Sequence, residues 1–169
     1  MLSKYGKWND FAGNCRIIEG FICEWESSLC PAKNRLASAG QLHDALRKAN
    51  PRYNGKAIFS GKDGEITEVG LLDTGVTNLS PLKGLRLTSL NINWTGVTDL
   101  SPLEKMPIRS IEMTRSQVDD ISPLAGMPLI SLRIDGTKVR DLSSVKGMPL
   151  TYLDLSHSRV TDLSSLAGM

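Results

Sequence analysis

The sequence predicts an α/β-type solenoid of short stacked repeats, with a parallel sheet on its concave face and 3₁₀ turns on its convex face. The first observation behind this prediction is a motif that recurs every 21 residues, as from residue 76 to residue 97. One valine marks the same place in every unit: Val76, Val97, Val118, Val139 and Val160. A unit of this length cannot bury a hydrophobic face alone, so neighbouring units must stack to complete the core.

The second observation is the order of apolar residues at the start of each unit, of which Leu87, Leu90 and Ile92 are one example. Because the last two of these residues are two positions apart, their side chains point to the same face of a strand. The strand therefore buries one side and exposes the other.

The third observation is the length of what remains of each unit. Residues 98–107, for example, leave only about ten residues for two connections and a convex element, which is too short for a long helix. We therefore expect a 3₁₀ turn, and three units place a proline where its fixed φ would start that turn. These prolines are Pro81, Pro102 and Pro123.

The units resemble the leucine-rich-repeat family, whose pattern is L-x-x-L-x-L-x-x-N-x-L. The resemblance extends from about Ile66 to the C-terminus, and the 21-residue period is similar to that of the short bacterial, internalin-like class. It implies five repeats over residues 66–169, the last one incomplete, and a binding role for the concave face. At the position of the family's asparagine, this chain has a hydroxyl residue in each unit: Thr74, Thr95, Ser116, Thr137 and Ser158. We expect these hydroxyls to cap backbone groups where the strand turns.

The residues ahead of the repeats are predicted to form an N-terminal cap over residues 41–65, since the end of a solenoid exposes core and a strand edge. Ser38 and Gln41 have the spacing of a capping box that opens a short helix. Pro51 disfavours helix at the residue before it, so the helix should end there. We place His43, on this helix, at the surface.

A hairpin is expected to complete the cap. Residues 56–59 and 65–69 have the composition of two strands, and the sequence Gly-Lys-Asp-Gly at residues 61–64 contains an Asp-Gly turn signal. The helix and the hairpin would together cover the first repeat.

The last repeat is expected to expose apolar surface around Val160, Leu163 and Leu166, because it stops in the middle of a unit with no cap sequence after it. Exposed core of this kind predicts self-association of the chain.

The first 26 residues resemble a different family. The motif Trp8-Asn9-Asp10, followed by Phe-Ile-Cys-Glu at residues 21–24, is similar to the final two strands of a C-type lectin-like domain. The resemblance implies a calcium and sugar role for Asn9 and Asp10, but Ca²⁺ needs about six to eight oxygen ligands and most of such a domain is missing here. We therefore expect carbohydrate binding only if the lectin-like domain is complete, and the alternative is a short hairpin with a coincidental motif.

Residues 27–40 are predicted to be a linker. A lectin-like tail, a linker, a cap and repeats together indicate a fragment of a larger multidomain bacterial protein. The sequence does not fix its location, although one outside the cytoplasm or at the cell surface is favoured for such a protein.

No cofactor or metal site is predicted. The three cysteines, Cys15, Cys23 and Cys30, do not have the close spacing of zinc ligands, even with His43 as a fourth ligand. The sequence also lacks a GxxxxGK[ST] phosphate loop, a GxGxxG turn and an HExxH helix, so we expect no catalytic residues and no enzymatic activity.

Charge and hydropathy exclude two further classes. The chain has 20 Lys and Arg residues against 18 Asp and Glu residues, for a net charge of +2. It lacks the clustered cations that neutralise phosphates, so nucleic-acid binding is not expected. No apolar run approaches the roughly 18 residues that a membrane span requires.

The candidate site lies on the strand face that points away from the core. Its residues are Asn91, Asn93, Trp94, Glu112, Arg115, Arg133, Asp135, Tyr152, Asp154 and His157. Trp, Tyr and Arg are the residue types enriched at protein-binding hot spots, so we predict that this surface binds another protein. The alternative is a solvated face on which Glu112, Arg133 and Asp154 only pair with one another, which is worth about 0–1 kcal/mol per pair.

Two other functions stay open. The lectin-like domain could bind carbohydrate while the repeats serve as a stalk. Alternatively, the chain could be a regulatory or sensor segment of a larger enzyme.

Overall fold

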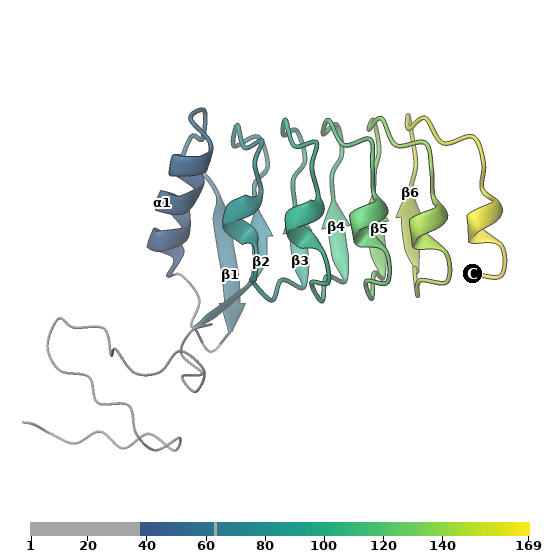
Figure 1. Cartoon of the computed structure of the whole chain (residues 1–169), viewed down its shortest axis with the longest axis horizontal. Coiled ribbons are helices and arrows are strands. Elements are labelled where there is room, and N and C mark those ends of the chain that lie inside the picture. Colours follow the sequence, from purple (N-terminus) through teal and green to yellow (C-terminus); the bar gives the residue numbers. More distant parts are fainter. Residues whose placement is uncertain (1–37, 63) are drawn as a thin grey trace, which may run out of the picture. The chain divides into compact units, whose positions relative to one another are not determined.

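A computed structural model describes residues 38–62 and 64–169, which form a solenoid of stacked units (Figure 1). Within these residues, six strands form one sheet in chain order. The N-terminal elements are helix α1 (Ala39–Ala49) and strands β1 (Ile58–Lys62) and β2 (Glu65–Gly70). The remaining strands are β3 (Ser89–Asn91), β4 (Ser110–Glu112), β5 (Ser131–Arg133) and β6 (Tyr152–Asp154). The 3₁₀ turns are η2 (Ser80–Leu82), η3 (Ser101–Leu103), η4 (Ser122–Leu124), η5 (Ser143–Val145) and η6 (Ser164–Leu166).

The lectin-like segment expected over residues 1–26, with Asn9 and Asp10, lies outside the described residues. The same is true of the three cysteines and of the expected linker up to residue 37.

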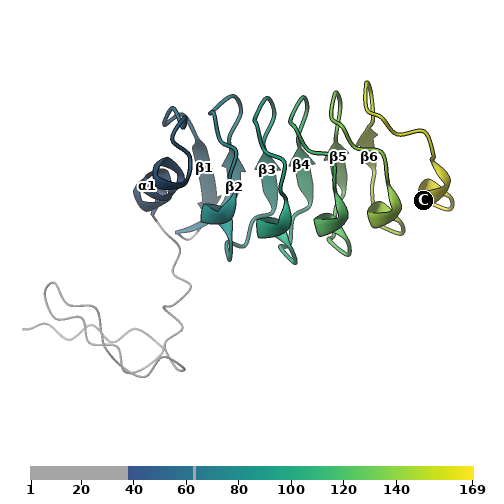
Figure 2. The same ribbon diagram turned by 45° about the horizontal axis from the view of Figure 1, so that its top comes forward.

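Strands β2 to β6 run parallel, and each pairs in register with the strand one repeat further along the chain. The central residues of neighbouring strands, such as Leu90 and Ile111, lie opposite each other and are buried. Figures 1 and 2 show the 3₁₀ turns on the side of the stack opposite to the strands. The predicted fold class, a solenoid with a parallel sheet and one 3₁₀ turn per repeat, is confirmed.

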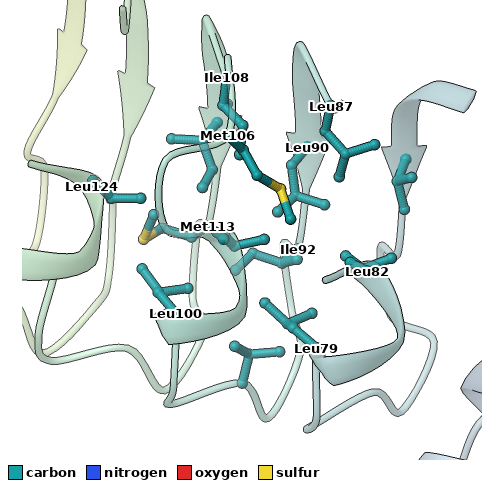
Figure 3. Packing of buried hydrophobic residues seen from close by; sticks show 14 of the residues in the cluster. Leu79, Leu82, Leu87, Leu90, Ile92, Leu100, Met106, Ile108, Met113 and Leu124 are labelled. Atoms are coloured by element: carbon teal, nitrogen blue, oxygen red, sulfur yellow. The ribbon is translucent and has the colours of Figure 1, made fainter. Parts of the chain in front are cut away.

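Leucine and isoleucine side chains fill the space between the strands and the 3₁₀ turns. Figure 3 shows Leu90 and Ile92 from the strand side of one repeat together with Leu79 and Leu100 from the turn side of two repeats. All four side chains are at most 1% exposed. One continuous core therefore runs through the stacked repeats, as the apolar periodicity predicts.

Each 3₁₀ turn begins beside an aspartate or asparagine side chain. In η3, the carboxylate of Asp99 accepts the N–H of Ser101 at 2.8 Å and its hydroxyl at 2.9 Å. These bonds from the Ser101 backbone and hydroxyl lower the pKa of Asp99. Proline occupies the first positions of η2, η3 and η4, as predicted, but η5 and η6 form the same turn with serine there. The five turns share a hydrogen bond from the N–H of their first serine to the aspartate or asparagine side chain two residues earlier, whereas the proline is not common to all.

The hydroxyl residues at the end of each strand act as expected in most repeats. Thr74, Thr95 and Thr137 each donate to the carbonyl three residues earlier at 2.7 Å. The hydroxyl of Ser158 accepts the N–H of Val160 at 3.4 Å. The expectation is wrong for Ser116, whose buried hydroxyl has no partner among the described residues. A serine lacks the methyl group that restricts a threonine's χ1, so its hydroxyl is less firmly directed at the carbonyl.

Helix α1 opens with the predicted capping box. The Ser38 hydroxyl accepts the N–H of Gln41 at 3.3 Å, and the Gln41 side chain accepts the N–H of Ser38 at 2.8 Å. The helix begins at Ala39, two residues before the expected start of the cap, and buries Leu42 and Leu46 against the first repeat. Its end is at Ala49, as the following proline predicts.

Asn50 connects the cap to the first repeat. Its side-chain oxygen accepts the N–H groups of Thr77 and Asn78 at 2.9 and 2.8 Å, and its amide donates to the carbonyls of Leu46 and Asn78. Asn50 is 1% exposed, so these bonds satisfy both the oxygen and the NH₂ group of a buried side chain.

Strands β1 and β2 form the predicted antiparallel hairpin. Strand β1 begins two residues later and ends three residues later than expected, and β2 ends one residue later. The register shifts between Ser60 and Gly61. A Cβ atom at position 61 would overlap the carbonyl oxygen of Glu65, so only glycine fits this irregularity.

The surface position expected for His43 holds only in part, because its side chain is half-buried. Its Nδ1 atom lies 2.6 Å from the hydroxyl of Tyr53, and its ring meets Phe59 edge-on at 4.8 Å between centroids. Tyr53 is buried, and burial raises its pKa above the ordinary tyrosine value. The chain turns back after Pro51 and places Tyr53 beside the helix, a contact that helical spacing alone does not show.

The last repeat exposes part of its apolar side. Leu163 is 55% exposed, whereas Leu100 and Leu142 at the equivalent places are 1% exposed. Val160 and Leu166 are partly buried. Self-association through this surface stays a prediction. No helix among residues 38–62 and 64–169 is long and apolar enough to cross a membrane.

Candidate protein-binding surface

The concave face presents three rows of side chains that run across the strands. In strands β3, β4 and β5 the central residue is buried and its two neighbours point outward. In β6 the central Leu153 is partly buried. Row one contains Glu68, Ser89, Ser110, Ser131 and Tyr152. Row two contains Gly70, Asn91, Glu112, Arg133 and Asp154. Row three, two residues further along each unit, contains Leu72, Asn93, Thr114, Asp135 and Ser156.

A hydrogen-bond network occupies the middle of this face. The amides of Asn91 and Asn93 both donate to the Glu112 carboxylate, at 3.1 and 3.0 Å. The side-chain oxygen of Asn93 accepts the N–H of Thr114 at 2.6 Å. These bonds cross from one repeat to the next, so the Glu112 carboxylate is held in place.

Arg133 continues the network toward the C-terminus. Its guanidinium lies 3.6 Å from the Glu112 carboxylate and 3.8 Å from that of Asp154, and it donates to the Tyr152 hydroxyl at 3.0 Å. The bond to Tyr152 raises the pKa of Arg133, while hydrogen bonds from Ser156 lower the pKa of Asp154. The three charges therefore do pair across strands, in exposed contacts that contribute little to stability.

A second group lies at the edge of the face, where the strands turn. The guanidinium carbon of Arg115 lies 4.5 Å from the centre of the Trp94 ring, a cation–π contact. Both residues have positive φ angles, 58° for Trp94 and 53° for Arg115. Gly136 has a positive φ at the same place in the next repeat. Bulky residues rarely adopt this conformation, so the repeat geometry imposes it.

The third group is a polar contact between two side chains near the C-terminal end. Nδ1 of His157 lies 3.1 Å from the Asp135 carboxylate. His157 also has a positive φ angle, 53°. Protonated histidine would make this contact a salt bridge.

The structure thus places all ten predicted residues in three groups of mutual contacts. Sequence periodicity predicts their positions but not these partners. Sequence periodicity also gave no role to Gly136. A glycine at the place in the repeat that Trp94, Arg115 and His157 occupy in other units could have indicated the positive φ angle there. Within the part of the chain that the structure describes, no cluster of three or more His, Cys, Asp or Glu side chains could hold a metal ion.

Comparison with protein-family models and with curated proteins gives no match. Among solved structures, the chain is similar to an internalin C2 from Listeria monocytogenes, with 31% identity and a TM-score of 0.57 over 59% of this chain and 46% of that one. The fold is an internalin-like leucine-rich-repeat solenoid. A second internalin from the same species, inlF, is similar at 23% identity and a TM-score of 0.55, over 76% of this chain and 45% of that one. The chain spans less than half the length of either internalin.

The comparisons give no support for the C-type lectin-like resemblance of the first 26 residues.

Proposed function

We propose that the internalin-like repeats are a non-enzymatic module that binds another protein through the concave face formed by rows one to three and the Trp94 edge. The observation that carries this proposal is the variation between repeats. The inward positions repeat the same apolar types, whereas row two has a different residue in every unit. A surface that only needed to be soluble would not require five different side chains at equivalent places.

Two aromatic side chains support the proposal. Trp94 is 53% exposed and Tyr152 is 44% exposed, although the face on which they lie is mostly polar, with Leu72 as a further exposed apolar residue. Each ring holds an arginine guanidinium, at 4.5 Å for Trp94 and 5.3 Å for Tyr152. Side chains that are already ordered lose less conformational entropy on binding, which favours such groups as anchors.

The test is binding by surface variants. Proteins captured by the immobilised chain would be identified, and their dissociation constants measured against Trp94→Ala and Arg133→Glu. We expect each change to weaken binding at least about tenfold, as for hot-spot residues. Lys146→Glu is the matched control, because it makes the same charge reversal as Arg133→Glu on the convex side. Lys146 is exposed and directly follows η5.

Circular dichroism spectra should be unchanged in all three variants, since the altered side chains are exposed or partly exposed. A partner that binds the two concave variants as tightly as the parent chain would show that the chosen surface is wrong.

A second candidate is carbohydrate binding by a complete lectin-like domain, and the motifs Trp8-Asn9-Asp10 and Phe-Ile-Cys-Glu at residues 21–24 favour it. A longer chain that contains such a complete domain would be passed over a panel of immobilised monosaccharides with calcium and then with a chelator. Calcium-dependent retention that Asn9→Ala abolishes would favour this function, and elution without retention would count against it.

A further inference from the structure

We propose that Arg115, held by Trp94 and Gly136 at the edge of the concave face, is the docking point for an aspartate or glutamate side chain of the protein partner. The proposal rests on the proposed function, because it assigns the chemistry of one contact on that same surface.

The Arg115 side chain is ordered at both ends. Its guanidinium carbon lies 4.5 Å from the centre of the Trp94 ring. Its stem lies over Gly136, where an added Cβ would come within 2.9 Å of the Arg115 Cγ. Gly136 therefore leaves room for the arginine stem on the side of the following repeat, while the guanidinium lies over the tryptophan of the preceding repeat. A guanidinium held in this way loses little further freedom when it binds a ligand.

The donors of Arg115 are not used within the molecule. Over residues 38–62 and 64–169, its guanidinium makes no ion pair and no side-chain hydrogen bond. Arg133, on the same face, lies between Glu112 and Asp154. The carboxylate of Asp135, in the repeat next to Arg115, is paired with His157 instead. Arg115 is thus an exposed and preordered cation whose N–H groups are open to an external acceptor.

The surroundings favour a protein carboxylate over a phosphate. A guanidinium stacked on an aromatic ring keeps its N–H donors at its rim, where a planar carboxylate can accept two of them. Glu112, Asp135 and Asp154 outnumber the single cation of Arg133 beside them, so a dianionic phosphate would be repelled more strongly than a singly charged carboxylate. The site therefore fits an acidic side chain delivered by a complementary protein surface.

The experiment uses the full chain and an oligoglutamate peptide as the probe. Nuclear magnetic resonance would follow the Trp94 indole N–H signal, assigned with Trp94→Phe, during titration at constant ionic strength. We expect the signal to shift with oligoglutamate, and the affinity to fall at least about tenfold in Arg115→Ala. Arg115→Lys should bind with intermediate affinity because it keeps the charge but loses the two-pronged geometry. Arg140→Ala, an exposed arginine next to the cap of η5, is the matched control and should bind like the parent chain.

Three results would overturn the proposal. The first is no shift of the Trp94 signal with oligoglutamate, and the second is an equal shift in Arg115→Ala. The third is an equal or stronger response to inorganic phosphate, which would indicate a general anion site. Each of these outcomes leaves the proposed function standing if Arg133→Glu still abolishes binding of the captured partner. Loss of the proposed function would instead appear as partner binding that no concave variant changes.

Discussion

The two sides of each repeat differ in how much their residues vary from unit to unit. On the inner and convex side the same types recur, such as the leucines before the 3₁₀ turns at positions 79, 100 and 142, each 1% exposed. On the concave side, row two passes through glycine, asparagine, glutamate, arginine and aspartate. The fold therefore depends on the inner and convex positions and leaves the concave side chains free for recognition.

The physical reason is the different cost of changing the two sets. A shortened inner side chain leaves a cavity between repeats, because the stacked neighbours can close it only in part. A shortened concave side chain leaves only water in its place. Stability and binding should accordingly respond to different substitutions.

The largest expected effect is on the convex side. Leu103→Ala, in η3 at 0% exposure, should lower the free energy of unfolding by about 2–5 kcal/mol through cavity formation. Arg133→Ala, on the concave side, should lower it far less, because the ion pairs it removes are screened by solvent. Urea denaturation followed by circular dichroism measures both. Equal losses in the two variants would contradict the division between the faces.

Asn93 is expected to be an exception to this division, because it lies on the concave side and yet should contribute to stability. Its side chain accepts the Thr114 N–H at 2.6 Å and donates to Glu112 at 3.0 Å. Asn93→Ala should lower the free energy of unfolding by about 1–2 kcal/mol, since it removes both bonds between neighbouring repeats. Thr114→Ala, in the same row, is the control: its hydroxyl makes no hydrogen bond among the described residues, and the substitution keeps the backbone N–H that Asn93 accepts. An Asn93→Ala variant as stable as the parent chain would mean that these hydrogen bonds do not contribute to stability.

The sequence could predict the rows but not these contacts. A fixed period of 21 residues places equivalent residues side by side, and the apolar spacing decides which of them face inward. These two facts were enough for the parallel sheet, the 3₁₀ turns and the positions of all ten candidate residues. They say nothing about rotamers, so the bonds that join Glu112 to its neighbours became visible only in three dimensions.

The cap shows the same limit more clearly, because it does not repeat. Asn50 reaches Thr77 and Asn78 across more than twenty residues of chain, and His43 reaches Tyr53 around a turn. No period relates these residues, and each contact depends on how the chain turns after Pro51. Sequence reasoning therefore gave the helix and the hairpin but not the polar contacts that fasten them.

A smaller effect is expected at Ser116. Among the hydroxyl residues that follow each strand at the same place in the repeat, its hydroxyl is the one without a partner among the described residues. Ser116→Thr should raise the free energy of unfolding by about 0.5–1 kcal/mol, because threonine at the equivalent positions 74, 95 and 137 donates to a backbone carbonyl. The reverse change, Thr95→Ser, is the matched control and should lower stability. Thermal denaturation compares the two, and a loss of stability in Ser116→Thr would show that the pocket cannot accept the added methyl group.

The smallest effect concerns acid and the caps of the convex turns. Hydrogen bonds from the serine two residues later lower the pKa of Asp99, Asp141 and Asp162 in the folded chain. Their stabilisation is complete above the pKa of an unfolded aspartate, about 3.9, and is lost as the pH falls from there through the lower folded values. Asn78 caps the first turn with a neutral side chain that accepts the Ser80 N–H at 2.8 Å, so it is the natural template for a test. A chain with all three aspartates changed to asparagine should keep its turns, be less stable than the parent at neutral pH, and lose less stability than the parent as the pH falls below about 3.9. Urea denaturation at several pH values measures this, and an equal fall in stability in the two chains would mean that other carboxylates decide the acid stability of the solenoid.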